Sequence, residues 1–324
     1  MWKKIILYII CLMLFCACST SKDNSSTKVM EAEYEGIIMP GMEHLYAENE
    51  EGYYFDTYSD LSRDKERNGV INVSDIGDTL YFKVESAGRK REIAVQVFID
   101  YAQTPIRVNG NEYDTYYINA DEAYSQEIPF QIAEDISDGV NHKIMAAMTV
   151  SSDMNAVNTE TERVTDKYSI AYDEILVVGE GKELYRPGGK EPIEESIERY
   201  QDFWEGALVN DDLTTFKRKL PPKEIVCKAG ENIELAYHLG GFEDCGEVLL
   251  LVCLDMKQVH VNQKNYIHVQ GEKDEIAKGT FKIEVPDTPG LCDLTGWVVK
   301  NPFSDRSTPL IPLKAVPRFT LRVE

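Results

Sequence analysis

Cysteine thiols and histidine imidazoles are the side chains of this sequence best suited to covalent or metal chemistry. After an N-terminal group of cysteines, the chain holds Cys227, Cys245, Cys253 and Cys292. These four lack the close pairs of a zinc site, and they allow three disulfide pairings. The histidines are scattered, without the spacing of a helical zinc motif, and His260 facing His268 across a hairpin is the zinc alternative. We therefore predict no metal site and no cofactor.

Nucleophilic and carboxylate catalysis leave no recognisable pattern either. The sequence has no Gly-x-Ser-x-Gly elbow and no cysteine beside an obvious base. Acidic residues are so abundant that some carboxylates will lie at glycosidase spacing by chance. The runs Asp121-Glu122, Glu134-Asp135 and 272–275 are typical of solvated turns; calcium is the alternative, although an ordered calcium loop is absent. We predict no catalytic residue and a non-enzymatic protein.

The charge balance excludes one class of partner. The 324 residues include 34 Lys and Arg against 56 Asp and Glu, a formal net charge of −22. Nucleic acid is excluded as a partner, because binding it requires basic residues that neutralise phosphates. With 43% hydrophobic residues the chain is a folded protein, and its length favours two domains.

The first residues are typical of an export signal. Lys3 and Lys4 precede an apolar run from Ile5 to Phe15, which is shorter than the roughly 20 residues of a membrane-spanning helix. We assign residues 1–17 to a signal peptide. An ordinary secretory signal with chance cysteines is one interpretation of this segment.

The residues Leu14-Phe15-Cys16-Ala17-Cys18 support a more specific interpretation. This stretch resembles the lipobox of bacterial lipoproteins, although Phe15 stands where that family prefers leucine. The resemblance implies that Cys18 is lipidated and becomes the N-terminus, so that the protein is held by its lipid outside the cytoplasm, in the cell envelope. Residues 18–30 then form a flexible polar tether.

The body of the chain is dominated by alternating apolar and polar residues with turn signals between them. This pattern predicts strands at 79–86, 92–101, 112–118, 126–133, 143–150, 167–178, 224–227, 232–238, 247–255, 265–269, 279–285, 292–299 and 318–323. The strand order resembles immunoglobulin-like or fibronectin-III-like sandwiches. We predict an all-β fold with two tandem immunoglobulin-like β-sandwiches, at residues 31–179 and 223–324.

The two predicted sandwiches share a faint internal repeat. Gly77-Asp78 matches Gly230-Glu231, and Phe98-Ile99-Asp100 matches Cys253-Leu254-Asp255 at nearly the same offset. Further matches keep the same order along the chain. Shared alternation alone would make apolar residues coincide, but the matched Asp and Gly are harder to explain that way. The repeat predicts that both halves have one topology.

Residues 180–222 form the predicted linker. After Pro192, the side chains of Ile193, Ile197, Tyr200 and Trp204 would lie on one face of a helix. We expect one short helix that packs against a neighbouring sandwich, and a partner-binding helix is the alternative.

Candidate ligand-binding residues are aromatic or lie in long connections. Tyr116 and Tyr117 offer aromatic area for sugar or peptide stacking, although tyrosine is also an ordinary strand residue. The connections 151–166 and 300–313 occupy equivalent places before the last strand of each half. The second contains Phe303, Leu310 and Ile311, which either form a contact surface or fold back on the core.

An immunoglobulin-like topology would also constrain the cysteines. Cys227 and Cys292 would then begin parallel strands and lie at one end, with Cys245 at the other, so that only the first pair could form a disulfide. We expect that this pair is either bridged or reduced, and that Cys253 is a buried thiol.

These observations favour a lipid-anchored, non-enzymatic protein whose sandwiches bind an unknown protein or glycan partner or support an assembly. One alternative is a carbohydrate-binding surface lipoprotein, suggested by the tyrosine content. Another is the solute-binding lipoprotein of a transporter, a class that normally has two α/β lobes, which the scarcity of helical periodicity disfavours.

Overall fold

The computed structural model describes residues 52–63, 69–134, 136, 140–158, 169–179, 191–194, 197–201, 205–211, 213, 223–242, 246–304 and 313–324. The predicted signal peptide, Cys18, the tether, Cys245, Leu310 and Ile311 lie outside these residues. Residues 51–324 belong to one compact unit. Within the described segments, no helix is long and apolar enough to span a bilayer.

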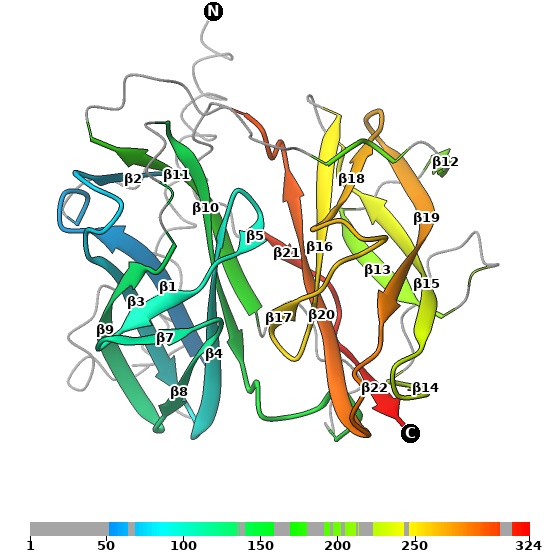
Figure 1. The fold of residues 1–324 in the computed structure, drawn as a ribbon, viewed down its shortest axis with the longest axis horizontal. Helices are drawn as coiled ribbons and strands as arrows, with labels where there is room; N and C mark the ends of the chain where they lie inside the picture. Colours follow the sequence, from blue (N-terminus) through cyan, green and yellow to red (C-terminus); the bar gives the residue numbers. More distant parts are fainter. Residues whose placement is uncertain are drawn as a thin grey trace, which may run out of the picture. The chain divides into compact units, whose positions relative to one another are not determined.

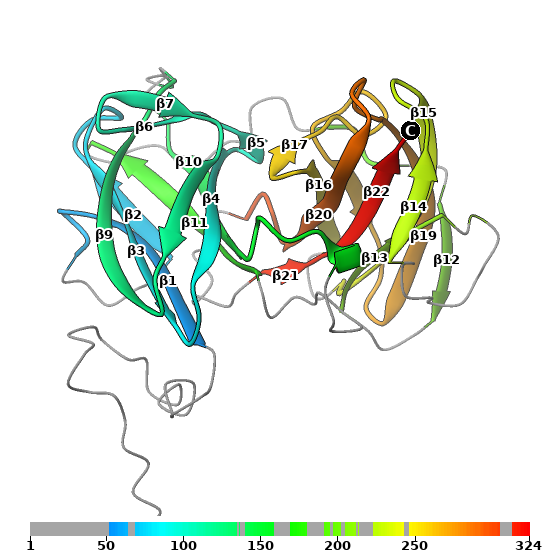
Figure 2. The same ribbon diagram turned by 90° about the horizontal axis from the view of Figure 1, so that it is seen from below.

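The first half of the unit is a sandwich of two sheets (Figures 1 and 2). Its strands are β1 (Gly52–Ser59), β2 (Val70–Val73), β3 (Leu80–Ala87), β4 (Arg91–Ile99), β5 (Ala102–Gln103), β6 (Ile106–Val108), β7 (Asn111–Tyr113), β8 (Tyr116–Ala120), β9 (Ala123–Ile132), β10 (His142–Val150) and β11 (Ser169–Val178). One sheet has the order β1-β3-β9-β6-β7, and the other β2-β11-β10-β4-β5, with β8 also paired to β4. The turn η2 (Ala156–Asn158) follows β10.

The second half repeats this arrangement. Its strands are β12 (Glu198–Gln201), β13 (Gly206–Asn210), β14 (Glu224–Cys227), β15 (Asn232–Gly240), β16 (Glu247–Leu254), β17 (Lys257–Gln258), β18 (Ile267–Gln270), β19 (Glu275–Glu284), β20 (Gly290–Lys300), β21 (Lys314–Ala315) and β22 (Phe319–Val323). One sheet has the order β12-β19-β15-β13, and the other β14-β22-β20-β16-β17, with β18 paired to β16 and β21 to β20.

The predicted fold class is confirmed by this strand pairing. In each half, three antiparallel strands of one sheet face a second sheet, as in an immunoglobulin-like sandwich. The central order of that second sheet is β11-β10-β4 in the first half and β22-β20-β16 in the second. Most predicted strands are found within one to four residues of their predicted ends. The predicted strand 112–118 is divided into β7 and β8 by a bend at Asp114-Thr115.

The internal repeat is also confirmed. A parallel pair begins each second sheet, β2 with β11 and β14 with β22. Asp100 and Asp255 share the left-handed backbone conformation, with φ of 49° and 44°. Asp100 Oδ1 accepts the Lys143 N–H at 2.9 Å, and Asp255 Oδ1 accepts the Asp293 N–H at 2.8 Å. Equivalent strands, turns and caps therefore recur, at offsets of 155 residues for Asp100 and Asp255 and 150 for Lys143 and Asp293.

The expected helix after Pro192 is wrong where the structure describes the segment. Residues 198–201 form β12, which pairs antiparallel with β19. Ile197 packs against the core of the second half. The spacing of Ile197 and Tyr200 suits a helix, but the edge of β19 offers backbone partners, and tertiary pairing overrides the local pattern. The segment predicted as a linker thus adds β12 and β13 to the second half.

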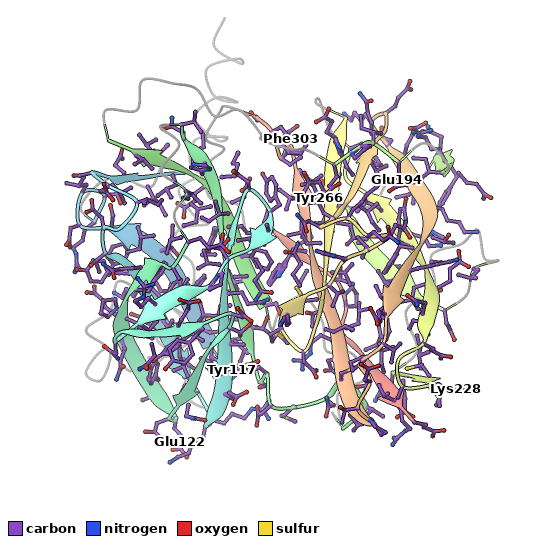
Figure 3. All side chains as sticks on the ribbon, viewed as in Figure 1. Tyr117, Glu122, Glu194, Lys228, Tyr266 and Phe303 are labelled. Carbon is purple, nitrogen blue, oxygen red and sulfur yellow. The ribbon has the colours of Figure 1, made fainter. Side chains whose placement is uncertain are left out.

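The two halves share an apolar interface. Phe98 and Met145 of the first half cluster with Leu251 and Trp297 of the second. Tyr101 at the end of β4 makes edge contacts with Tyr266 and Phe303, at ring-centroid distances of 6.1 and 6.0 Å (Figure 3 labels the last two). This burial fastens the two sandwiches to each other by the hydrophobic effect.

Gln103 and Gln258 form reciprocal hydrogen bonds across the interface between the halves. The Gln103 N–H donates to Gln258 Oε1 at 2.6 Å, and the Gln258 N–H donates to Gln103 Oε1 at 2.5 Å. Gln103 Nε2 donates to the carbonyl oxygen of Met256, while Gln258 Nε2 donates to that of Tyr101. Both residue pairs are equivalents in the repeat, at an offset of 258 − 103 = 155. The interface therefore has the reciprocal form of a two-fold dimer contact.

The connection after β10 reaches the second half. Arg318 donates to the carbonyl oxygens of Ser151 and Met154, at 3.2 and 2.5 Å. The Ala156 N–H donates to Asp293 Oδ2 at 2.9 Å. Arg318 Nη2 lies 2.8 Å from Asp293 Oδ2, so one buried ion pair organises the contact.

The connection after β20 reaches back to the first half. The Tyr101 hydroxyl donates to the Pro302 carbonyl oxygen, and the Leu313 N–H donates to the Ala171 carbonyl oxygen at 2.8 Å. The described parts of the two long connections thus contribute to the contact between the halves.

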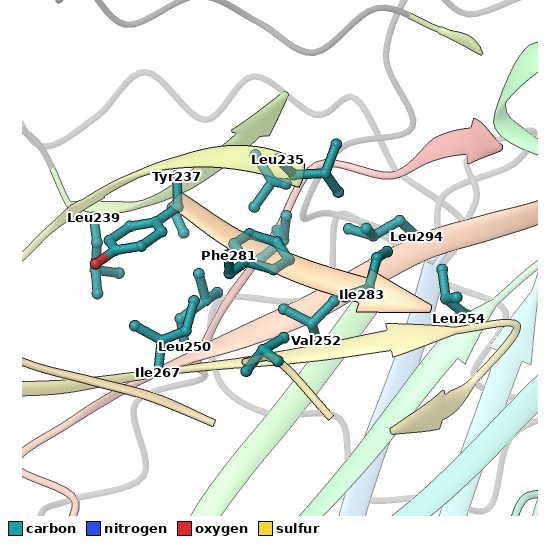
Figure 4. Close-up of a cluster of buried hydrophobic side chains, with 14 of the residues drawn as sticks. Leu235, Tyr237, Leu239, Leu250, Val252, Leu254, Ile267, Phe281, Ile283 and Leu294 are labelled. Atoms are coloured by element: carbon teal, nitrogen blue, oxygen red, sulfur yellow. The ribbon is translucent and has the colours of Figure 1, made fainter. Parts of the chain in front are cut away.

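Each half also has its own core between its two sheets. In the second half, Tyr237 and Phe281 from one sheet face Leu250 and Val252 from the other (Figure 4). The Tyr237 ring lies over Gly279, where a Cβ would stand 2.4 Å from the tyrosine hydroxyl. A glycine is therefore required beneath this ring.

Candidate functional site

The interface between the halves contains a second buried ion pair, in the first half. Lys143 Nζ lies 3.3 Å from Asp173 Oδ2, and the Tyr101 hydroxyl, whose one proton is shared between this atom and the Pro302 carbonyl oxygen, lies 3.1 Å from it. Burial raises the pKa of Asp173 to about 6, and Lys143 and the hydroxyl oppose that rise. The repeat places Lys143 where the second half has Asp293, at an offset of 150 (293 − 143), so the acid and the base have exchanged strands. Both members of this pair belong to the first half, so the ion pair itself does not cross the interface.

The raised pKa of Asp173 makes stability depend on pH. The neutral carboxyl is favoured in the folded chain, so its contribution is complete below the ordinary pKa of 3.8 and is lost as pH rises through about 6. We expect the unfolding free energy of Asp173→Asn, relative to the unsubstituted chain, to rise by about 2–3 kcal/mol between pH 4 and pH 7. Urea unfolding at the two pH values measures this difference, and a constant difference would contradict it.

The described cysteines are all free and buried. Burial raises the pKa of Cys292 and of Cys253 to about 12, which suppresses the reactive thiolate at neutral pH. Cys253 lies in the interface cluster, with its sulfur 3.7 Å from Gln96 Nε2. The prediction that Cys253 is a buried thiol is therefore confirmed.

The expected strand geometry of Cys227 and Cys292 is wrong. Cys227 ends β14 and Cys292 lies near the start of β20, and these strands are antiparallel because β22 is parallel to the first and antiparallel to the second. Strand β22 lies between β14 and β20, and Cys227 is opposite Val323 whereas Cys292 is opposite Leu321. Two strand spacings and this two-residue shift separate the Cα atoms by on the order of 10 Å, beyond the reach of a disulfide. Of the two alternatives, the structure contains the reduced pair.

The histidines are not brought together as a metal site. His268 is fully buried, its Nδ1 is 2.9 Å from the Glu191 carbonyl oxygen, and its ring contacts Phe303. His260 is exposed in a turn. Among the described residues, no group of three metal-ligating side chains is present.

Tyrosines gather along one side of the first sandwich. Tyr113 and Tyr116 meet edge to face, with ring centroids 5.3 Å apart. Tyr124 lies close enough to Tyr116 for the latter to influence its pKa, which burial raises to about 12. All three pack against the core while staying partly exposed. Tyr117 is on the other face of β8, and 45% of its surface is exposed.

The strands that carry these tyrosines have open edges. Within the described residues, β8 pairs only with β4, and the outer edge of β9 is unpaired over residues 123–130. The corresponding edges of the second half are covered by its own chain. The Glu194 N–H donates to the His268 carbonyl oxygen at 2.7 Å, and β12 pairs with β19.

The residues predicted to bind a ligand are therefore not united in one site. Tyr116 and Tyr117 lie on β8 at the open side of the first half, whereas Phe303 is packed between Tyr101 and His268 at the interface (Figure 3). Leu310 and Ile311 lie outside the described residues. The candidate site is the open side formed by β8, β9 and their tyrosines.

Sequence reasoning missed Tyr113, Tyr124 and the open edges. The one available signal for Tyr113 was its match to Tyr266 in the repeat, at an offset of 266 − 113 = 153. The difference in edge coverage has no local signal, because the covering segment is distant in sequence from the strands that it covers.

Comparison with known proteins adds no family. No protein-family model matches the chain, and no curated protein matches it. One similar structure is the CARDB domain of a Pyrococcus furiosus protein in complex with di-metal ions, at 14% identity over 39% of this chain and 89% of that chain. Another is the periplasmic chaperone SfaE, at 10% identity over 84% of this chain and 100% of that chain. A third is the C-terminal domain of the Streptococcus pyogenes antigen I/II-family protein AspA, at 9% identity over 83% and 98%. Each has a TM-score of 0.21, so these likenesses carry no argument, and the fold rests on its own strand pairing.

Proposed function

We propose that this chain is a lipid-anchored protein of the cell envelope that acts as a non-enzymatic binding module. The observation that carries the proposal is that the β8 and β9 side of the first half and the equivalent β18 and β19 side of the second half differ in how they are covered. One is closed by the chain itself, and the other has no covering strand among the described residues and is lined by tyrosines. Tyrosine combines a rigid apolar ring with a polar hydroxyl, which suits recognition surfaces. The lipid anchor is supported by the lipobox-like sequence at Cys18.

The fastened interface between the halves supports the binding role. The Gln103–Gln258 hydrogen bonds and those from Arg318 to the Ser151 and Met154 carbonyl oxygens hold the two sandwiches together, so that a partner bound to one half is also attached to the other. The net charge of −22 favours solubility and repels anionic polymers. A cationic or uncharged partner is therefore the expected class.

Substituting the anchor residue tests the location. We expect Cys18→Ala to move the protein from the membrane fraction to other fractions and to abolish fatty-acid incorporation, because the acylated thiol is lost. Cys16→Ala is the matched control and should leave both unchanged. Intact-mass measurement of the unsubstituted protein should show a lipidated Cys18, and an unmodified N-terminus would contradict the anchor.

Carbohydrate recognition is a second candidate, favoured by the partly exposed Tyr113, Tyr116 and Tyr117. Binding of the protein to a glycan array, and to the envelope fraction of the source cell before and after protease treatment, distinguishes a glycan partner from a protein partner. Binding to a protease-sensitive component with silence on the array supports a protein partner. Array binding that requires Tyr116 and Tyr117 supports the glycan. A catalytic turnover abolished by one carboxylate or cysteine substitution would contradict the non-enzymatic role.

A further inference from the structure

The second half shows how its β18 and β19 edges are filled. The Glu194 N–H donates to the His268 carbonyl oxygen at 2.7 Å, and Arg199 Nη2 donates to the Gln270 carbonyl oxygen at 2.9 Å. Residues 198–201 then pair with β19, and Ile197 reaches the core between the sheets. Residues 191–194 and 197–201, called the covering segment, thus close this side by backbone pairing and one aliphatic side chain.

Strand register identifies the equivalent backbone groups of the first half. His268 lies opposite Leu249 and Tyr117 opposite Ala94, and these partners are 155 residues apart (249 − 94). His268 is therefore the equivalent of Tyr117, and Gln270 that of Asn119, both at an offset of 151 (268 − 117 and 270 − 119). The carbonyl oxygen of Glu92, opposite Asn119, accepts the Ser152 N–H at 3.2 Å, so it is turned away from β8. In an antiparallel ladder, the N–H and C=O of Tyr117 and Asn119 therefore point to the outer edge.

These outward groups have no strand beside them in the described part of the chain. The first residues of β9, Ala123 to Gln126, are mostly exposed, whereas Ile276 to Lys278 of β19 are buried under β12. Exposed strand edges are templates for an added strand. We propose that the β8 and β9 edges bind an extended strand of a partner protein that carries basic side chains.

The charge of the partner follows from the repeat. Lys264 binds Glu194 of the covering segment at 2.7 Å, and Lys278 lies opposite Glu198. Their equivalents at an offset of 153 are Asn111 and Ser125. These positions lack a cation, and the exposed Glu112 and Glu122 flank them. A strand with basic residues in place of the glutamates of the covering segment is therefore complementary.

A designed peptide tests this inference, which rests on the proposed binding role and deepens it. The probe is a fluorescein-labelled peptide of residues 191–201 with Glu191→Lys, Glu194→Lys, Glu195→Lys and Glu198→Lys. We expect its binding to the mature protein, followed by fluorescence anisotropy, to be about tenfold weaker for Asn119→Pro, which removes an outward N–H. Asn119→Ala is the matched control and should bind within about twofold of the unsubstituted protein. The same peptide with its four glutamates should bind about tenfold more weakly.

Hydrogen exchange on the unsubstituted protein gives a second readout that needs no proline variant. The peptide should slow exchange of the Tyr117 and Asn119 amides without changing that of Ile118. Equal binding to Asn119→Pro and Asn119→Ala, or protection confined to other strands, would overturn the inference. Binding to a chain that starts at residue 51 but not to the mature chain would overturn it too. A partner retained elsewhere on the protein would leave the binding role intact.

Discussion

Asp293→Ala is expected to lower the free energy of unfolding by about 3–5 kcal/mol, because it leaves a buried guanidinium without its partner. Asp293 is 1% exposed and the Arg318 side chain 4% exposed. Asp293 accepts hydrogen bonds from Arg318, from the Thr320 hydroxyl at 2.7 Å and from the Ala156 N–H. Urea unfolding monitored by circular dichroism gives the difference.

The control for Asp293 removes both charges at once. A chain with Asp293→Leu and Arg318→Met should lose much less stability than Asp293→Ala, because neither side chain then carries an unpaired charge into the interior. The orphaned Ala156 N–H would account for the remaining cost. A loss below about 1 kcal/mol for Asp293→Ala, the range of an exposed ion pair, would contradict the buried network.

Trp297→Ala should be comparably destabilising, by about 3–5 kcal/mol. Trp297 is 2% exposed and lies in the cluster that contains Phe98 and Met145 of the first half. Its removal leaves a cavity between the halves, and the neighbouring strands can collapse into it only in part. We therefore expect the cost to appear as faster proteolysis at the connections between the halves, as well as in equilibrium unfolding.

The variant Trp297→Phe tests whether the loss of stability comes from lost apolar packing. Phenylalanine keeps most of the apolar area in the cluster and should cost clearly less than alanine. Leu208→Ala, on β13 and outside the interface cluster, provides a comparison for local loss of apolar area. Equal destabilisation by Trp297→Phe and Trp297→Ala would contradict the interface role.

Strand positions were largely predictable because alternation records which side chains face a core. The strand predicted at 224–227 is β14, and the one predicted at 247–255 is β16. β12 was not predictable, because the spacing of Ile197 and Tyr200 also satisfies a helix. The free edge of β19, which decides between them, is formed by residues more than 70 positions away. The parallel arrangement expected for the strands of Cys227 and Cys292 was wrong for a similar reason, since alternation does not specify which strand lies between two others.

The sequence by itself determined that the chain is all-β and duplicated, because side-chain period and repeated turn residues are local properties that fix face and register. The assignment of Tyr116 and Tyr117 as ligand-binding residues, made from the sequence, stays a prediction. Only the tertiary structure decided that, among the described residues, these tyrosines border strand edges without a partner strand, while Phe303 packs partly buried against the cluster between the halves. Whether a strand edge is covered depends on its pairing with a segment distant in the chain, and no local sequence pattern specifies that pairing.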